Sequence, residues 1–148
     1  MTAKNEPVDS VYAIIRVRGS AETVRPVEDT LKMLNLTRVN HCVVRKRTKS
    51  LDGMLAKATG NITWGPVKED VLEKLVAKKG RLAGDKKLDA KQAKEEAKRL
   101  AAGEEASIKK VFRLHPPSGG YRAIKRRFPE GDLGPRGEKI NELLMKMI

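Results

Sequence analysis

The sequence predicts an α+β fold in which a three-stranded sheet carries two helices on one face. Runs of β-branched residues alternate with runs of helical periodicity, in the order β-α-β-α-β, up to about residue 65. Apolar residues make up 39% of the 148-residue chain, enough for one modest core. We therefore expect a flexible tail over residues 1–10, a two-layer core over 11–66 and a C-terminal extension subdomain of mixed helical and extended structure over 67–148.

The first half of the core is predicted to be a strand, a helix and a second strand. Val11–Val17 (VYAIIRV) is a β-branched run typical of a strand. The helix that follows has Pro26 in its first turn, where a missing N–H is tolerated, and Asn35 suits a left-handed residue that ends it. Its apolar face consists of Val27, Leu31 and Leu34. Val39–Arg45 (VNHCVVR) predicts the second strand.

The second half of the core is predicted to be a short helix and a third strand. Ser50 can cap the helix and Gly60 can end it. Its apolar stripe consists of Leu51, Met54, Leu55 and Ala58. Asn61–Trp64 predicts the third strand, and we expect Gly65–Pro66 to close it.

Two helices are predicted next. A stripe at helical spacing indicates a helix that ends at Gly80, and the stripe consists of Val67, Val71 and Leu75. Asp89 can cap a surface helix that runs to about Ala102, with Gln92 completing a capping box.

The last part of the chain mixes extended and helical patterns. Ile108–Leu114 predicts a strand, residues 115–120 (HPPSGG) a stiff and then flexible loop, and residues 121–128 (YRAIKRRF) a basic, extended segment. The final amphipathic helix carries Ile140, Leu143, Leu144 and Met147.

The charge is strongly positive, with 32 Lys and Arg against 19 Asp and Glu and a net charge of +13. Two windows without any acid hold much of the excess: Thr30–Leu51 has six cations and Ala106–Pro129 has seven. Such an excess repels itself unless a polyanion neutralises it, and nucleic acid is the commonest such partner. The alternatives are an acidic membrane, for which no basic helix with bulky apolar anchors is evident, and a solvated basic surface.

Several classes of protein are excluded. No apolar run approaches the ~20 residues of a membrane helix, and we expect no secretory signal at the N-terminus. The single Cys42 cannot form an internal disulfide, and with two histidines it cannot complete a four-ligand zinc site. Neither a phosphate-binding glycine loop nor a nucleophile elbow is present. The sequence therefore predicts no enzyme, no cofactor, no metal and no small-molecule substrate.

Three basic segments are candidate phosphate contacts. The loop after the second predicted strand carries Arg45, Lys46, Arg47 and Lys49. The loop over residues 115–120 can approach an anionic surface closely, and Tyr121 can stack on an unpaired base. The densest run consists of Arg122, Lys125, Arg126 and Arg127. The alternatives are solvated loops and an ordinary turn in which Tyr121 is half-buried.

The run Asn40-His41-Cys42 raises the question of a thiol or metal site. Strand alternation places His41 on the face opposite its two neighbours, so the three cannot chelate a metal. We expect Cys42 to be a small buried apolar residue. Asn40 and His41 either touch RNA or bond to a loop. Core packing, more than base stacking, is expected of Trp64, Phe112 and Phe128.

The stretch Asp29–Cys42 (DTLKMLNLTRVNHC) resembles the signature of the family of large-subunit ribosomal proteins numbered thirty, in its archaeal form. Agreeing features of the core are Arg18-Gly19, Gly53-Met54 and Gly65-Pro66. Features that resemble the archaeal extension are Arg113 to Pro117, Gly119-Gly120 and Leu133-Gly134. The resemblance runs from about Tyr12 to the C-terminus, although Val67–Ser107 carries no motif.

The resemblance implies a core similar to a ferredoxin-like half, with strand one central in the three-stranded sheet and the extension packed beside it. It also implies a cytoplasmic, ribosome-associated structural constituent of the large subunit that binds large-subunit rRNA near 5S rRNA, among neighbouring ribosomal proteins. One position departs from the pattern, because Asp52 stands where relatives usually have Arg. An acid cannot make that phosphate contact, and the cations of the preceding loop can compensate.

The predicted RNA contacts are Arg18, Arg38, Asn40, His41, Arg45, Lys46, Arg47, Lys49, Arg113, His115, Tyr121, Arg122, Lys125, Arg126 and Arg127. The alternative function is a free-standing basic nucleic-acid-binding protein or RNA chaperone, which composition alone does not separate from a ribosomal role. We expect residues 11–65 to fold without RNA, because they have their own apolar faces. Residues 115–130 are expected to stay partly disordered until RNA binds.

Overall fold

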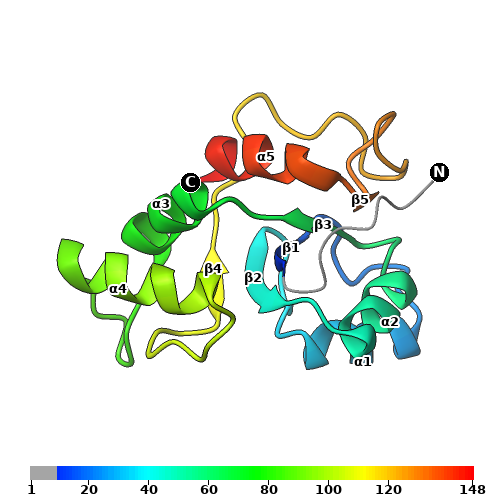
Figure 1. Ribbon diagram of the computed structural model, residues 1–148. Coiled ribbons are helices and arrows are strands. Elements are labelled where there is room, and N and C mark those ends of the chain that lie inside the picture. Colours follow the sequence, from blue (N-terminus) through cyan, green and yellow to red (C-terminus); the bar gives the residue numbers. More distant parts are fainter. Residues whose placement is uncertain (1–9) are drawn as a thin grey trace.

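The computed structural model describes residues 10–148 and arranges them as one mixed sheet between two groups of helices (Figure 1). The strand order is β4-β2-β1-β3-β5. The elements are β1 (Val11–Arg16), α1 (Arg25–Met33), β2 (His41–Lys46), α2 (Lys49–Lys57), β3 (Ile62–Pro66), α3 (Glu69–Lys79), α4 (Ala90–Ala101), β4 (Val111–Arg113), β5 (Gly134–Pro135), the 3₁₀ helix η1 (Gly137–Lys139) and α5 (Ile140–Met147). Of the predicted tail, residues 1–9 lie outside the described part.

The predicted β-α-β-α-β core is confirmed, and its first strand is central. β1 pairs antiparallel with β2 on one side and with β3 on the other. The sheet is wider than the three strands predicted, because the extension adds a strand at each edge. β4 pairs antiparallel with β2, and the two-residue β5 pairs parallel with β3.

Both faces of the sheet are covered. Tyr12 and Ile14 pack in a hydrophobic cluster with α1 and α2, the two helices predicted to share one face. Ala13 and Ile15 point the other way, into a cluster formed with α3, α4 and α5. Figure 1 shows α5 above the sheet and α1 and α2 below it. All six residues of β1 are buried, as expected for an unbroken apolar run covered from both sides.

Several element boundaries differ from the prediction, each for a local reason. β2 begins at His41, because Asn40 has a φ of 65°, which lies outside the β region of a regular strand. Thr48, and not Ser50, caps α2, since its hydroxyl accepts the Leu51 amide at 3.1 Å. β3 continues through Gly65–Pro66, where it still pairs with β1.

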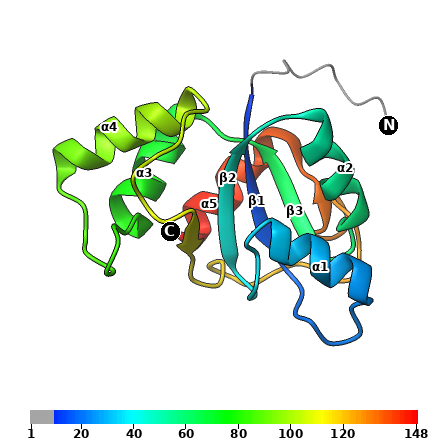
Figure 2. The same ribbon diagram turned by 90° about the horizontal axis from the view of Figure 1, so that it is seen from below.

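Other predicted signals are confirmed. Asn35, with a φ of 62°, follows the end of α1, and Asp89 and Gln92 form the capping box of α4. After β4 the chain crosses one end of the sheet before it reaches β5 (Figure 2). In the part of the chain that is described, no helix combines the length and apolar character needed to cross a membrane.

Candidate nucleic-acid interface

One end of the sheet collects cations from separate parts of the chain. β1 ends there, because Arg16 pairs with Ile62 at the start of β3, and Arg18 follows. β2 starts there, just after Arg38, and His41 pairs with Arg113 at the end of β4. Figure 2 shows these strand ends together, with the gold segment after β4 running across them. We call this region the basic sheet end.

The loop over residues 121–130 is tied to the basic sheet end on both sides. The Tyr121 hydroxyl donates to Asn40 Oδ1 at 2.6 Å, just before β2. At the other side of the loop, Arg127 forms an isolated parallel β-bridge with Leu133. Leu133 leads into β5, which pairs with β3. The cations that this arrangement leaves exposed at the basic sheet end are Arg38, Arg113, Arg122, Lys125, Arg126 and Arg127, with His115 exposed nearby and Arg18 half-buried.

The pKa of His41 reflects the positive charge of this region. Its pKa lies below the usual 6.5, first because of partial burial and then because of the charges of Arg113, Arg38 and Arg16. Its Nδ1 atom is buried and has no hydrogen-bond partner among the described residues. A lowered histidine pKa is the response expected of a partly buried imidazole near positive charge, because both effects disfavour the protonated form.

Asn40 and Tyr121, both predicted RNA contacts, are engaged within the protein. The backbone N–H of Asn40 donates to the backbone carbonyl of Arg16 at 2.8 Å, and the backbone carbonyl of Asn40 accepts from the backbone N–H of Leu114 at 3.2 Å. Burial, and then the charge of Asp132, raises the pKa of Tyr121 to about 12. The structure thus agrees with the alternatives in which Asn40 bonds to a loop and Tyr121 is half-buried. Contact of either residue with RNA stays a prediction.

The predicted cations of residues 45–49 lie at the opposite end of β2. The six residues of that strand separate them from the basic sheet end by roughly 17 Å. Arg47 Nε contacts both Asp52 carboxylate oxygens, at 3.3 and 3.2 Å, and its guanidinium lies 5.5 Å from the Tyr12 ring centre. Asp52 therefore pairs with one of the cations that were predicted to compensate for it. Arg45 donates to the Met33 carbonyl at 3.4 Å, and Lys46 and Lys49 are exposed.

Cys42 is fully buried, and burial raises the pKa of its thiol to about 12. The prediction of a small apolar core residue is confirmed. Within residues 10–148, no three His, Cys, Asp or Glu side chains come together as potential metal ligands.

Sequence reasoning missed the buried charges that hold the basic sheet end in shape. Arg16 is 1% exposed and donates to the carbonyls of Arg18 and Leu36 at 2.8 and 2.7 Å. It also pairs with Glu28 on α1 at 3.2 Å. A lone charge inside an apolar strand was the available signal. Arg16 thereby joins the end of β1 to the segments that carry Arg18 and Arg38.

Comparisons with known proteins match nearly the whole chain. A family model described as ribosomal protein L30p/L7e matches residues 12–59. The large ribosomal subunit protein uL30 of Methanosphaera stadtmanae is 46% identical, over 93% of this chain and 100% of the relative. The proteins of that name from Nanoarchaeum equitans and Methanobrevibacter smithii are 43% and 41% identical, over 94% and 93% of this chain and 99% and 100% of theirs. The similarity therefore includes both the core and the extension.

Proposed function

Because the chain belongs to the ribosomal protein L30p/L7e family, we propose that it binds large-subunit rRNA through the basic sheet end, close to 5S rRNA. As a member of this family, the chain is a structural constituent of the large ribosomal subunit and not an enzyme. The observation that carries the proposal is the gathering of cations from four chain segments at one end of the sheet.

The chemistry of these side chains fits a phosphate backbone. Guanidinium groups bind phosphate oxygens through two parallel hydrogen bonds, and each phosphate neutralised releases counterions. Because the strands and the tethered loop fix the backbone segments that carry the cations, we expect recognition by backbone shape, with little reading of bases. The opposite end of β2 contributes less, since Asp52 already neutralises Arg47.

Salt-dependent binding to purified large-subunit rRNA tests the proposal. The variant Arg38→Gln, Arg113→Gln, Arg122→Gln removes three exposed charges from the basic sheet end. We expect the slope of log K against log salt to shrink by roughly 2–3 units. The matched control replaces three exposed α4 lysines by Gln, at Lys91, Lys94 and Lys98, and should leave the slope nearly unchanged. Equal losses in both variants would refute a localised interface.

The position relative to 5S rRNA needs an assembled large subunit. A cleavage reagent attached to Ser118→Cys, in the exposed loop, should cut large-subunit rRNA and 5S rRNA. The unchanged protein is the control, because its only cysteine is buried and protonated. The absence of any cut in 5S rRNA would refute the proposed proximity to 5S rRNA.

Sucrose-gradient sedimentation separates the ribosomal role from a free-standing nucleic-acid binder. We expect the protein to sediment with large subunits at moderate salt. A wholly free pool would favour the alternative.

A further inference from the structure

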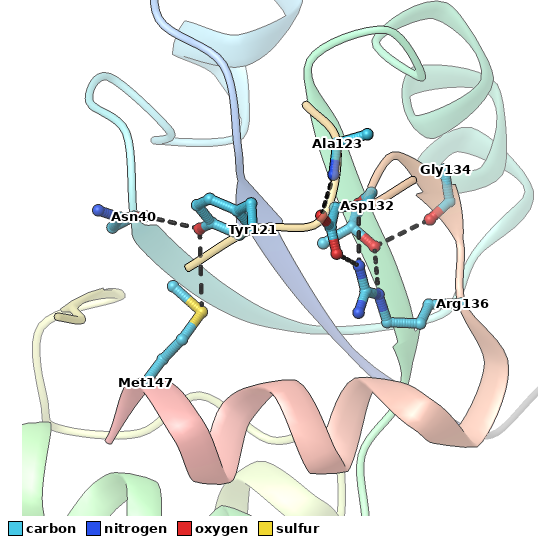
Figure 3. A network of polar contacts seen from close by, with 8 residues as sticks. Asn40, Tyr121, Ala123, Asp132, Gly134, Arg136 and Met147 are labelled. Carbon is cyan, nitrogen blue, oxygen red and sulfur yellow. Dashed lines mark hydrogen bonds and ion pairs between the residues drawn. The ribbon is translucent and has the colours of Figure 1, made fainter. Parts of the chain in front are cut away.

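An acid lies at the base of the most basic loop in the chain. Asp132 is 7% exposed, and its two carboxylate oxygens have different partners (Figure 3). Oδ2 accepts the Ala123 amide at 3.0 Å, and Oδ1 accepts from Arg136 Nη2 at 2.7 Å. The Asp132 amide in turn donates to the Ala123 carbonyl at 2.9 Å. Asp132 thus closes the loop at Ala123 with two hydrogen bonds.

Arg136 connects this closure to the sheet. Its Nε donates to Thr63 Oγ1 on β3 at 3.3 Å, and its amide donates to the Trp64 carbonyl at 2.9 Å. Its guanidinium also lies 5.2 Å from the ring centre of Phe128. The arginine and aspartate side chains are only 8% and 9% exposed, so water screens the pair little.

Further contacts restrain the loop on either side of Ala123. The Tyr121 hydroxyl, which donates to Asn40, also lies 4.0 Å from Met147 Sδ on α5. The Arg126 carbonyl accepts the Leu133 amide at 3.2 Å. The side chains held between these points are exposed: Arg122, Ile124, Lys125 and Arg126. The segment predicted to be partly disordered is therefore hydrogen-bonded to the folded core.

We propose that Asp132 is a positioning residue for RNA binding, which holds residues 121–127 in the shape that presents their cations to rRNA. The proposal rests on the proposed rRNA-binding function. By charge alone, an acid beside four cations weakens phosphate binding. A loop ordered in advance avoids the entropy lost when a mobile segment becomes fixed on its ligand. The negative charge of Asp132 therefore lowers the affinity for RNA, whereas its ordering of the loop raises it. We propose that the ordering is the larger of the two effects.

Two variants with the same change in charge separate these effects. Asp132→Asn and Glu130→Gln each remove one acid from the loop, but Glu130 is exposed. The Asn amide nitrogen would face one of two donors, the Ala123 N–H or the Arg136 guanidinium. We expect Glu130→Gln to bind large-subunit rRNA as tightly as the unchanged protein or more tightly. Asp132→Asn should bind roughly tenfold more weakly, with a salt slope within about one unit of the original.

Tyr121→Phe provides a second, milder variant, because it removes the hydroxyl anchor and keeps the ring and the charge. We expect about threefold weaker binding at an unchanged salt slope. Hydrogen exchange on the free protein should show protected amides at Ala123 and Leu133, and faster exchange in both variants. If Asp132→Asn does not fold, Tyr121→Phe decides. Unchanged affinity in Tyr121→Phe, or Asp132→Asn binding like Glu130→Gln, would overturn the proposal.

A third variant distinguishes failure of this proposal from failure of the proposed function. Replacing Arg122, Arg126 and Arg127 by Ser removes exposed charges but none of the backbone bonds of the loop. It should reduce both affinity and salt slope. Binding at the original level would refute RNA binding by this loop altogether. Weaker binding by this variant, with Asp132→Asn matching Glu130→Gln, would refute only the positioning role.

Discussion

Arg16 places a full positive charge at the end of an otherwise apolar strand, where it is 1% exposed. Burial of a guanidinium is tolerated when its donors are satisfied, and here two carbonyls and Glu28 accept from it. These partners lie in three segments that meet at the basic sheet end. One side chain therefore connects core stability with the geometry of the interface.

Replacing Arg16 by Met tests this connection. Met fills similar space but leaves the Leu36 and Arg18 carbonyls without their donor. We expect the free energy of unfolding to fall by about 2–4 kcal/mol in urea denaturation. Arg38→Met, at an exposed position, should change it by no more than about 0.5 kcal/mol. Similar values for the two variants would mean that the Arg16 bonds contribute little.

His41 makes stability depend on pH. Its lowered pKa means that the folded protein binds this proton less readily than the unfolded chain. Stability from this source is present above the unfolded pKa of 6.5 and declines as the pH falls below it. Denaturation at pH 5 to 8 should show this decline in the unchanged protein, and a smaller one in His41→Gln. Identical pH profiles for the two proteins would show that His41 does not cause the decline, because they differ in no other titrating group.

At the scale of elements, the close approach of η1 and α5 restricts which residues β3 can contain. Gly65 lies in this strand, where a Cβ atom would overlap the Gly137 carbonyl oxygen and crowd Ile140. Glycine is therefore required for η1 and α5 to lie against the sheet. Gly53, in α2, is under no such constraint, because apart from its chain neighbours and the backbone of its own helix no atom lies within 4 Å of the position that a Cβ atom would occupy there.

Alanine at these two glycines should have opposite effects. Gly65→Ala is expected to destabilise the protein by about 1–3 kcal/mol through overpacking. Gly53→Ala should stabilise it by about 0.5–1 kcal/mol, because glycine weakens a helix interior. Thermal or urea unfolding of both variants measures the difference. A neutral Gly65→Ala would show that α5 can shift away from β3 without cost.

At the scale of the whole molecule, the core and the extension share one sheet and one hydrophobic cluster. Ala13, Ile15 and Cys42 are fully buried, and the side chains that cover them come from residues beyond 66. The predicted boundary at residue 66 therefore divides the chain but not the hydrophobic core, because one cluster contains residues from both sides of it.

A fragment of residues 1–66 should not form a stable fold. Its uncovered sheet face would expose apolar surface, so we expect binding of a hydrophobic dye and no cooperative unfolding transition. The full chain should unfold in one transition without RNA. For residues 11–65 this departs from the expectation that their own apolar faces suffice, because the extension covers one face of their sheet. Cooperative unfolding of the fragment, with the circular dichroism of a folded protein, would contradict this.

The sequence by itself determined most of the local structure and the kind of partner. Strand and helix signals such as Pro26, Asn35 and the Asp89–Gln92 capping box act within a few residues, so they can be identified without tertiary contacts. The acid-free windows likewise indicate a polyanionic partner, because an excess of one charge is a property of composition alone. The family signature over Asp29–Cys42 supplied the central position of the first strand.

Only the tertiary structure decided which cations share a surface and which polar groups act inside the protein. Lys46 and His41 belong to one short strand but lie at opposite ends of the sheet, whereas Arg113, distant in sequence, pairs with His41. Asp132 and Tyr121 find their partners through packing between the extension and the core. Such proximities depend on strand pairing and burial between distant segments, which no local propensity encodes.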